Sequence, residues 1–143
     1  MEVNVKIVEN DKEKELVLSI RRIVFIQELN IPENMEINEN EDSATYVLAN
    51  IESEYVGTAR WRYTDLGIKL ERFAVLSEYR SCGVGTAMTK FILNQLDHSK
   101  LIYLNAQESA ISFYEKLGFD LMGPRFDEVG IPHQKMIFPK VSK

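Results

Sequence analysis

The sequence holds a single cysteine, Cys82, and only two histidines, His98 and His133, among its 143 residues. A lone cysteine cannot form a disulfide within the chain, which is typical of proteins from a reducing compartment. Zinc sites need several closely spaced cysteine or histidine ligands, so no metal site is expected. These absences favour a cytoplasmic protein that folds without disulfides or a structural metal.

Long apolar runs and an excess of basic charge are also missing. No stretch approaches the roughly 20 apolar residues that cross a bilayer. Residues 1–10 alternate between apolar and polar side chains and carry charges, unlike the apolar core of a secretory signal. The 17 Lys and Arg residues stand against 22 Asp and Glu, which gives a formal net charge of −5 and argues against a general affinity for nucleic acid. The sequence therefore predicts neither a membrane nor a nucleic-acid partner.

The composition is otherwise that of an ordinary globular protein, with 45% hydrophobic and 27% charged residues. No internal repeat, low-complexity segment or Pro/Gly/Ser-rich linker divides the chain. We therefore expect residues 1–143 to form one domain with a core of its own. The oligomeric state is left open, a homodimer included.

The N-terminal part shows a strand pattern followed by a helix pattern. Residues 3–7 alternate apolar and polar side chains, which predicts a strand. Asp11 is placed to cap a helix that ends near Pro32. Residues 23–26 are apolar on every side, so we expect the second half of this helix to be buried. Its expected apolar face consists of Leu16, Ile20, Ile23 and Val24.

The remainder alternates short strands with two helices. Apolar residues recur at helical spacing from Val84 to Leu96, so the strands on either side of this helix are expected to be parallel. A second helix is expected to start at a Ser109 cap and to end at Gly118. A loop over 127–132 is expected between the last two strands. The expected strands are 44–51, 55–63, 68–76, 101–106, 119–126 and 133–138, which gives an α/β chain with a mixed sheet.

The segment Arg80-Ser-Cys-Gly-Val-Gly-Thr86 lies between a predicted strand and the clearest predicted helix. Its glycines let successive N–H groups converge at a helix N-terminus, where the helix dipole favours an anion, and Arg80 adds a positive charge. The Walker pattern needs a lysine that is absent here, and the dinucleotide fingerprint needs a glycine where Met88 stands. Two interpretations remain from the residues: a cradle for phosphate, or a strand-to-helix turn without a ligand.

Two motifs in order favour the cradle. The strand at 68–76 followed by Arg80 to Gly85 resembles motif A of the GNAT N-acetyltransferase superfamily. Asn105 to Phe119, with its Phe-Tyr-x-x-x-Gly-Phe ending, resembles motif B. In detail the chain resembles the ElaA-like subgroup, in Val24-Phe25 to Glu28, Ile31-Pro32 and Gly130 to His133, and departs from it at Leu29.

The resemblance implies a GNAT-like fold, which is a mixed, mostly antiparallel sheet flanked by helices. In this fold a splayed pair of parallel strands, here 68–76 and 101–106, forms the cleft for acetyl-CoA. The pantetheine arm would pair with the backbone of the first strand and the pyrophosphate would lie on the loop amides. The implied acetyl-CoA-binding residues are Phe73, Ala74, Val75, Arg80, Ser81, Cys82, Gly83, Val84, Gly85, Thr86, Asn105 and Tyr114.

The resemblance also implies catalytic roles. Tyr114 would protonate the departing CoA thiolate, although its position on an apolar helix face also suits a plain core residue. The amine must be neutral to attack, and Glu28, Glu71, His133 or water could remove its proton. Glu28 and His133 are also candidates to bind the acceptor.

The acidic stretch from Glu28 to Asp42 contains no Lys or Arg, and it is either a solvated loop or a surface that attracts a cationic amine. The sequence thus predicts an acetyl-CoA-dependent N-acyltransferase that acts on a small-molecule or peptide primary amine by direct attack in a ternary complex. The alternatives are a non-catalytic acyl-CoA-binding sensor module and an acyl-homoserine-lactone-type synthase.

Overall fold

The computed structural model describes residues 2–28, 43–128 and 130–139, with the backbone alone at 27 and 28. By its contacts the chain divides into two compact units. The first comprises residues 1–61 and 72–96, and the second comprises residues 62–71 and 97–143. Strand β4 (Ile68–Val75) contributes its first half to the second unit and its second half to the first.

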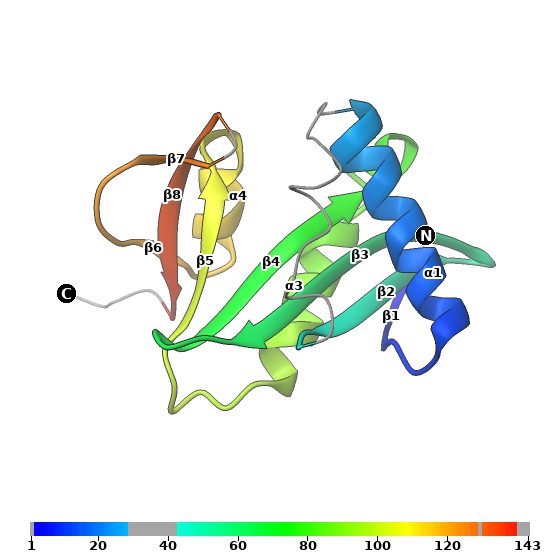
Figure 1. Ribbon diagram of the computed structural model, residues 1–143, viewed down its shortest axis with the longest axis horizontal. Helices are drawn as coiled ribbons and strands as arrows, with labels where there is room; N and C mark the ends of the chain where they lie inside the picture. Colours follow the sequence, from blue (N-terminus) through cyan, green and yellow to red (C-terminus); the bar gives the residue numbers. More distant parts are fainter. Residues whose placement is uncertain (1, 29–42, 129, 140–143) are drawn as a thin grey trace. The chain divides into compact units, whose positions relative to one another are not determined.

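The strands join in the order β1-β2-β3-β4-β5-β8-β6, and β7 pairs with β8 (Figure 1). The pairs β1–β2, β2–β3, β5–β8, β6–β8 and β7–β8 are antiparallel, whereas β4 and β5 are parallel. The parallel ladder consists of Ile68, Lys69 and Leu70 opposite Ile102, Tyr103 and Leu104. This confirms the expected mixed, mostly antiparallel sheet with one parallel pair.

Helices cover both faces of the strands in the first unit (Figure 1). On one face, α1 and the π-helix η1 contribute Val17, Ile20 and Val24 to a core with Tyr46 and Leu48 of β2. Fully burying an aliphatic side chain contributes about 1.5–3 kcal/mol, so this face stabilises the unit strongly. The elements are β1 (Val3–Ile7), α1 (Asp11–Arg21), η1 (Arg22–Glu28), β2 (Thr45–Ile51), β3 (Glu54–Tyr63), β4, η3 (Ser77–Tyr79) and α3 (Val84–Gln95).

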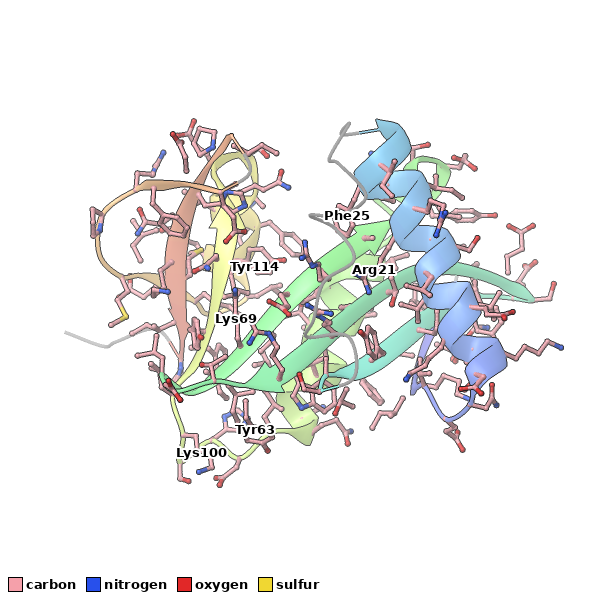
Figure 2. The ribbon with its side chains drawn as sticks, in the orientation of Figure 1. Arg21, Phe25, Tyr63, Lys69, Lys100 and Tyr114 are labelled. Carbon is pink, nitrogen blue, oxygen red and sulfur yellow. The ribbon has the colours of Figure 1, made fainter. Side chains whose placement is uncertain are left out.

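Two expectations for the first helix are wrong in detail. Asn10, not Asp11, caps α1: its side chain accepts a hydrogen bond from the Glu13 N–H at 2.9 Å, and Asp11 is already helical. Ile23 is exposed, because the buried face runs through Val17, Ile20, Arg21 and Val24 at helical spacing. Figure 2 shows Arg21, which is fully buried, directed from α1 toward the strands.

On the other face α3 packs closely against β3. A Cβ atom added at Gly57 would lie 2.7 Å from Val84 Cγ1 and 3.2 Å from Met88 Cε. Only glycine allows this approach of the first turns of α3 to the strand. The N-terminus of α3 is therefore fixed on the sheet of the first unit.

The second unit builds its sheet around β5 and β8. The expected strand over 119–126 is wrong: the structure has two short strands separated around Pro124, whose ring nitrogen cannot donate to a ladder. The expected loop over 127–132 is also wrong at both ends, because β7 and β8 pair from Phe126 opposite His133 to Glu128 opposite Ile131. The elements are β4, β5 (Ile102–Gln107), η4 (Glu108–Ala110), α4 (Ile111–Lys116), β6 (Asp120–Leu121), β7 (Phe126–Glu128) and β8 (Ile131–Phe138).

Helix α4 follows β5 after one turn of 3₁₀-helix. Ser109 does not cap it, because it lies within that turn and Ala110 takes the N-cap position without a side-chain hydrogen bond. The expected end at Gly118 is confirmed: the Gly118 N–H donates to Glu115 O, and the Phe119 N–H donates to Tyr114 O, both at 3.1 Å. Of the helices described, none is both long and apolar enough to span a bilayer.

Candidate active site

The loop before α3 has the backbone expected of an anion cradle. Gly83 is the N-cap of α3 with φ +83°, a left-handed conformation that favours glycine. The first helical hydrogen bond of α3 runs from the Ala87 N–H to Gly83 O at 3.0 Å. The N–H groups of Val84, Gly85 and Thr86 precede it, so the helix itself provides them with no acceptor. These three amides stand at the positive end of the helix dipole.

Two further loop residues are tied to the chain around them. The Cys82 N–H donates to Tyr79 O at 3.3 Å, so this amide already has an acceptor within the loop. The sequence predicts instead that it binds the pyrophosphate. The exposed Arg80 donates from Nε to Val75 O at 3.0 Å, which links the loop to the end of β4. Ser81 and Gly83 are exposed, so the outer side of the loop is accessible to a ligand.

Strand β4 contains an unusual backbone conformation just before Phe73–Val75. Arg72 has φ +57°, a conformation that non-glycine residues adopt rarely and that often marks a functional segment. After it, Ala74 is buried in the core of the first unit, and Phe73 and Val75 are half-buried. No local pattern in the sequence predicts this irregularity.

Tyr114 is buried in the second unit, on α4. Its ring lies edge to face with Phe113 and Phe119, with ring centroids 5.0 and 5.7 Å apart. Burial raises the pKa of the Tyr114 phenol above its usual value. The phenol is therefore protonated throughout the neutral range, as a proton donor must be.

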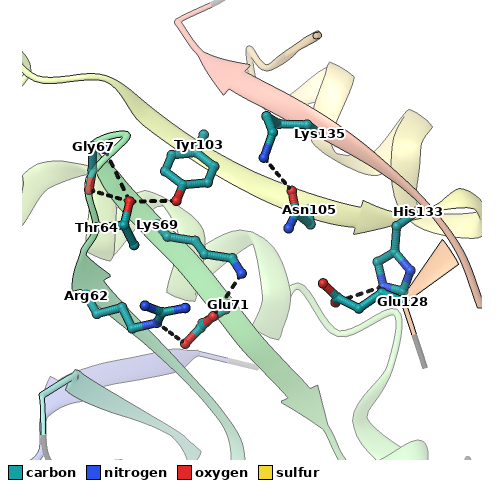
Figure 3. Close-up of polar contacts among 10 residues, drawn as sticks. All are labelled: Arg62, Thr64, Gly67, Lys69, Glu71, Tyr103, Asn105, Glu128, His133 and Lys135. Carbon is teal, nitrogen blue, oxygen red and sulfur yellow. Dashed lines mark hydrogen bonds and ion pairs between the residues drawn. The ribbon is translucent and has the colours of Figure 1, made fainter. Parts of the chain in front are cut away.

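Glu71 lies between two cations (Figure 3). Its carboxylate binds Arg62 Nε at 2.9 Å and Lys69 Nζ at 3.3 Å, and the three side chains are 12–20% exposed. Both cations stabilise the ionised carboxylate, which loses that stabilisation when it takes up a proton. The geometry is that of an ionic anchor between β3 and β4.

His133 is buried beside β7. Its Nδ1 lies 2.7 Å from Ile131 O, its Nε2 lies 3.5 Å from Glu128 Oε2, and its ring stacks on Phe126 with centroids 6.0 Å apart. Both ring nitrogens thus have partners within the second unit. The side chain of Glu28 and the acidic segment 33–42 lie outside the described residues.

Asn105 belongs to a polar group on the second unit that sequence reasoning missed (Figure 3). Its Oδ1 accepts from Lys135 Nζ at 3.3 Å, and this ammonium lies 4.8 Å from the centroid of the Tyr103 ring. The Tyr103 hydroxyl lies 2.7 Å from Thr64 Oγ1. The alternation of side chains along β5 and β8 was the one sequence signal that could have suggested this group. The strand register then brings its members together.

The predicted site residues thus fall into two sets. The loop residues and Phe73–Val75 belong to the first unit, whereas Glu71, Asn105, Tyr114 and His133 belong to the second. Within the part of the chain that is described, no three His, Cys, Asp or Glu side chains gather as a metal site would require.

The family model described as "Acetyltransferase (GNAT) domain" matches residues 10–139. The chain belongs to the GNAT acetyltransferase family. A Bacillus subtilis strain 168 protein named "Uncharacterized N-acetyltransferase YjcF" is 34% identical over 134 residues, which are 92% of this chain and 96% of the relative. The acyl donor of the chain described here, as of the GNAT family, is acetyl-CoA.

Solved structures show the same fold. Escherichia coli ElaA matches with a TM-score of 0.79 and 23% identity, over 95% of this chain and 99% of that one. A GNAT family acetyltransferase from Elizabethkingia anophelis with acetyl-CoA bound matches with a TM-score of 0.64 and 16% identity, over 94% and 95% of the two chains. The resemblance inferred from motifs A and B is therefore confirmed, and the chain is an N-acetyltransferase by family.

Proposed function

We propose that residues 1–143 act as one domain that transfers the acetyl group of acetyl-CoA to a primary amine of a small molecule or peptide. Donor and acceptor bind together and the amine attacks the thioester directly. The observation that carries the proposal is the loop at α3, where Gly83 turns the backbone and three successive amides remain for an anion. We expect the protein to act in the cytoplasm.

In this proposal acetyl-CoA is bound by backbone groups more than by side chains. The pyrophosphate lies on the amides of Val84, Gly85 and Thr86, beside Arg80. Ser81, Cys82 and Gly83 complete the loop. The pantetheine arm pairs with the backbone of Phe73, Ala74 and Val75, and Asn105 contributes its side chain.

The transfer step then needs a group that stabilises the carbonyl oxygen, an acid for the sulfur and a base for the amine. A backbone N–H near Val75 stabilises the negative charge that develops on the carbonyl oxygen. Tyr114 donates its proton, or a strong hydrogen bond, to the departing sulfur. A thiol has an ordinary pKa of about 8.5, so the raised pKa of Tyr114 makes complete proton transfer to the thiolate uphill, and the phenol acts mainly by a hydrogen bond to the departing sulfur.

The proton on the attacking amine has several possible acceptors. Glu71 contacts two cations and His133 contacts two oxygens, so neither is arranged as a free base. We therefore assign the step to Glu28 or to water. His133 stays a proposed acceptor-binding residue together with Glu28.

Calorimetry tests donor binding. Gly85→Val places a branched side chain among the loop amides, so the folded variant should lose affinity for CoA, and unchanged affinity would overturn the loop assignment. Acetyl-CoA should also raise the Tm of the wild-type protein more than NADH or ATP does. A sensor module would bind CoA without releasing thiol in the presence of amines, and a homoserine-lactone-type synthase would need S-adenosylmethionine and an acyl carrier.

A further inference from the structure

The sheet of the second unit has one apolar and one polar face. Ile102, Leu104 and Ala106 of β5 are buried on the face that carries α4 and the Phe119–Phe138 contact. The alternate residues Tyr103 and Asn105 point to the other face. We call this the polar face; it includes the side chains of Arg62, Lys69, Glu71, Tyr103, Asn105 and Lys135, and the register adds Ile137 and His133 of β8 to it.

The register explains how the polar face is assembled. Lys69 of β4 lies opposite Tyr103 of β5, and Lys135 of β8 lies opposite Asn105. Three neighbouring strands therefore bring Lys69, Tyr103 and Lys135 to one face of the sheet (Figure 3). All of these residues belong to the second unit.

Lys135 has an unusual environment for a lysine. Its ammonium contacts the Asn105 amide oxygen at 3.3 Å and the face of Tyr103, and among the described residues no carboxylate lies within salt-bridge distance of it. Burial lowers the pKa of Lys135 and the positive charge of Lys69 lowers it further, while the negative charge of Glu128 offsets part of this decrease. The two ammonium groups are thus close enough to repel each other.

Glu71 does not relieve this repulsion at Lys135. Its carboxylate already binds both Arg62 and Lys69, while the Glu128 carboxylate, whose charge also acts on Lys135, lies 3.5 Å from His133 Nε2. Packing alone would not retain such a charge, because an apolar side chain could cover the Tyr103 ring without the cost of desolvating an ammonium group. A partly buried cation that faces another cation is the arrangement that an anionic ligand stabilises.

We propose that Lys135, with Lys69 beside it, binds an anionic oxygen group of the acceptor, so that the acceptor is an amine that also carries a carboxylate, such as an amino acid. The single ammonium group suits one carboxylate. This inference rests on the proposed acetyl transfer and narrows its acceptor class. A phosphate-bearing amine shares this chemistry, and the experiment separates the two.

The first test measures binding without turnover. Lysines carrying isotope-labelled methyl groups would be titrated by NMR, with the Lys135 signal assigned by its loss in Lys135→Arg. N-acetylglycine should raise the pKa of Lys135, while its neutral amide should leave that pKa unchanged. Equal effects of the acid and the amide overturn the proposal, and a larger effect of inorganic phosphate transfers it to phosphate-bearing amines. A response to CoA equal to that with N-acetylglycine assigns the site to the donor and also overturns it.

The second test compares acceptors by acetyl-CoA-dependent thiol release. Amino acids should exceed their decarboxylated amines in kcat/KM by roughly tenfold to a hundredfold. Lys135→Met, which keeps the stem over Tyr103, should abolish this preference mainly through KM, and Lys135→Arg should restore part of it. Lys100→Met, at an exposed lysine before β5, should keep the full preference. Thiol release that favours the decarboxylated amines would overturn this inference and leave the acetyl transfer itself standing, whereas no release with any amine would overturn the proposed function.

Discussion

The ring of Tyr114 meets the ring of Phe119 edge to face, with centroids 5.7 Å apart, and the Phe119 N–H donates to Tyr114 O at 3.1 Å. Phe119 is fully buried, so it holds both the backbone and the ring of Tyr114 in place. Edge-to-face pairs of this kind contribute about 0.5–1.5 kcal/mol beyond the buried area. The phenol is therefore fixed before any ligand binds.

Alkaline unfolding should report the burial of this phenol. Because the pKa of Tyr114 is raised in the folded protein, the unfolded chain releases this proton first as the pH passes about 10. The contribution of Tyr114 to stability is fully present below that pH, and above it the free energy of unfolding should fall by about 1.4 kcal/mol per pH unit. Tyr114→Phe should remove this part of the slope in denaturant titrations.

The matched control is Tyr63→Phe, because Tyr63 is 65% exposed at the end of β3 (Figure 2). Its alkaline slope should equal that of the wild-type protein. If the Tyr114→Phe variant has the same alkaline slope as the wild-type protein and the Tyr63→Phe variant, the Tyr114 phenol is solvated in the folded protein, contrary to its buried position on α4.

The loop conformation predicts a difference between two substitutions at Gly83. A Cβ at this position would meet nothing within 4 Å, so the cost of a side chain comes from φ alone. Gly83→Ala should lower the free energy of unfolding by about 1 kcal/mol, and Gly83→Asn by less, since asparagine tolerates the left-handed region. Urea titrations compare them; equal stabilities of the three proteins would be inconsistent with the positive φ.

The ionic anchor makes a third prediction. Glu71→Gln leaves Arg62 and Lys69 half-buried without their carboxylate, and it should destabilise the protein by about 2 kcal/mol. A double-mutant cycle with Arg62→Met should show coupling between the two positions. If stability instead stays unchanged while the acid limb of the kcat/KM profile disappears, Glu71 is the base and the anchor role is wrong.

The local signals in the sequence predicted those parts of the fold that local chemistry decides. Gly118 ends α4 as expected, and the helical stripe from Val84 predicts α3, and with it the parallel pair β4–β5. The N-cap of α1 was predicted at the wrong one of two adjacent residues. Asn10 and Asp11 can both cap a helix, and the structure uses Asn10.

Other features depend on contacts that no local pattern encodes. Arg21 and Arg60 are fully buried, although a basic residue on a helix or strand is usually placed at the surface. No local pattern predicts the positive φ of Arg72, and the contact of Lys135 with Tyr103 arises from strand register. The motif suggested the loop residues as a site, whereas Lys69 and Lys135 come to one face only in the assembled sheet.

Kinetics of Tyr114→Phe test the role of the hydroxyl. The substitution keeps the ring and its packing on Phe119, so CoA affinity should change little. If the phenol assists the departing thiolate, kcat and kcat/KM should fall together by about 10²–10⁴-fold. Wild-type turnover by the variant, under conditions where chemistry limits the rate, would make Tyr114 a core residue only.

Acetyl transfer itself is most directly measured with isotope-labelled acetyl-CoA and a panel of primary amines, with mass-spectrometric detection of the N-acetylated product. We expect label in the amine product, thiol release in equal amount, and loss of both in Gly85→Val at donor concentrations that saturate the wild-type protein. Release of thiol that no amine accelerates, with no labelled amine in any reaction, would contradict the account.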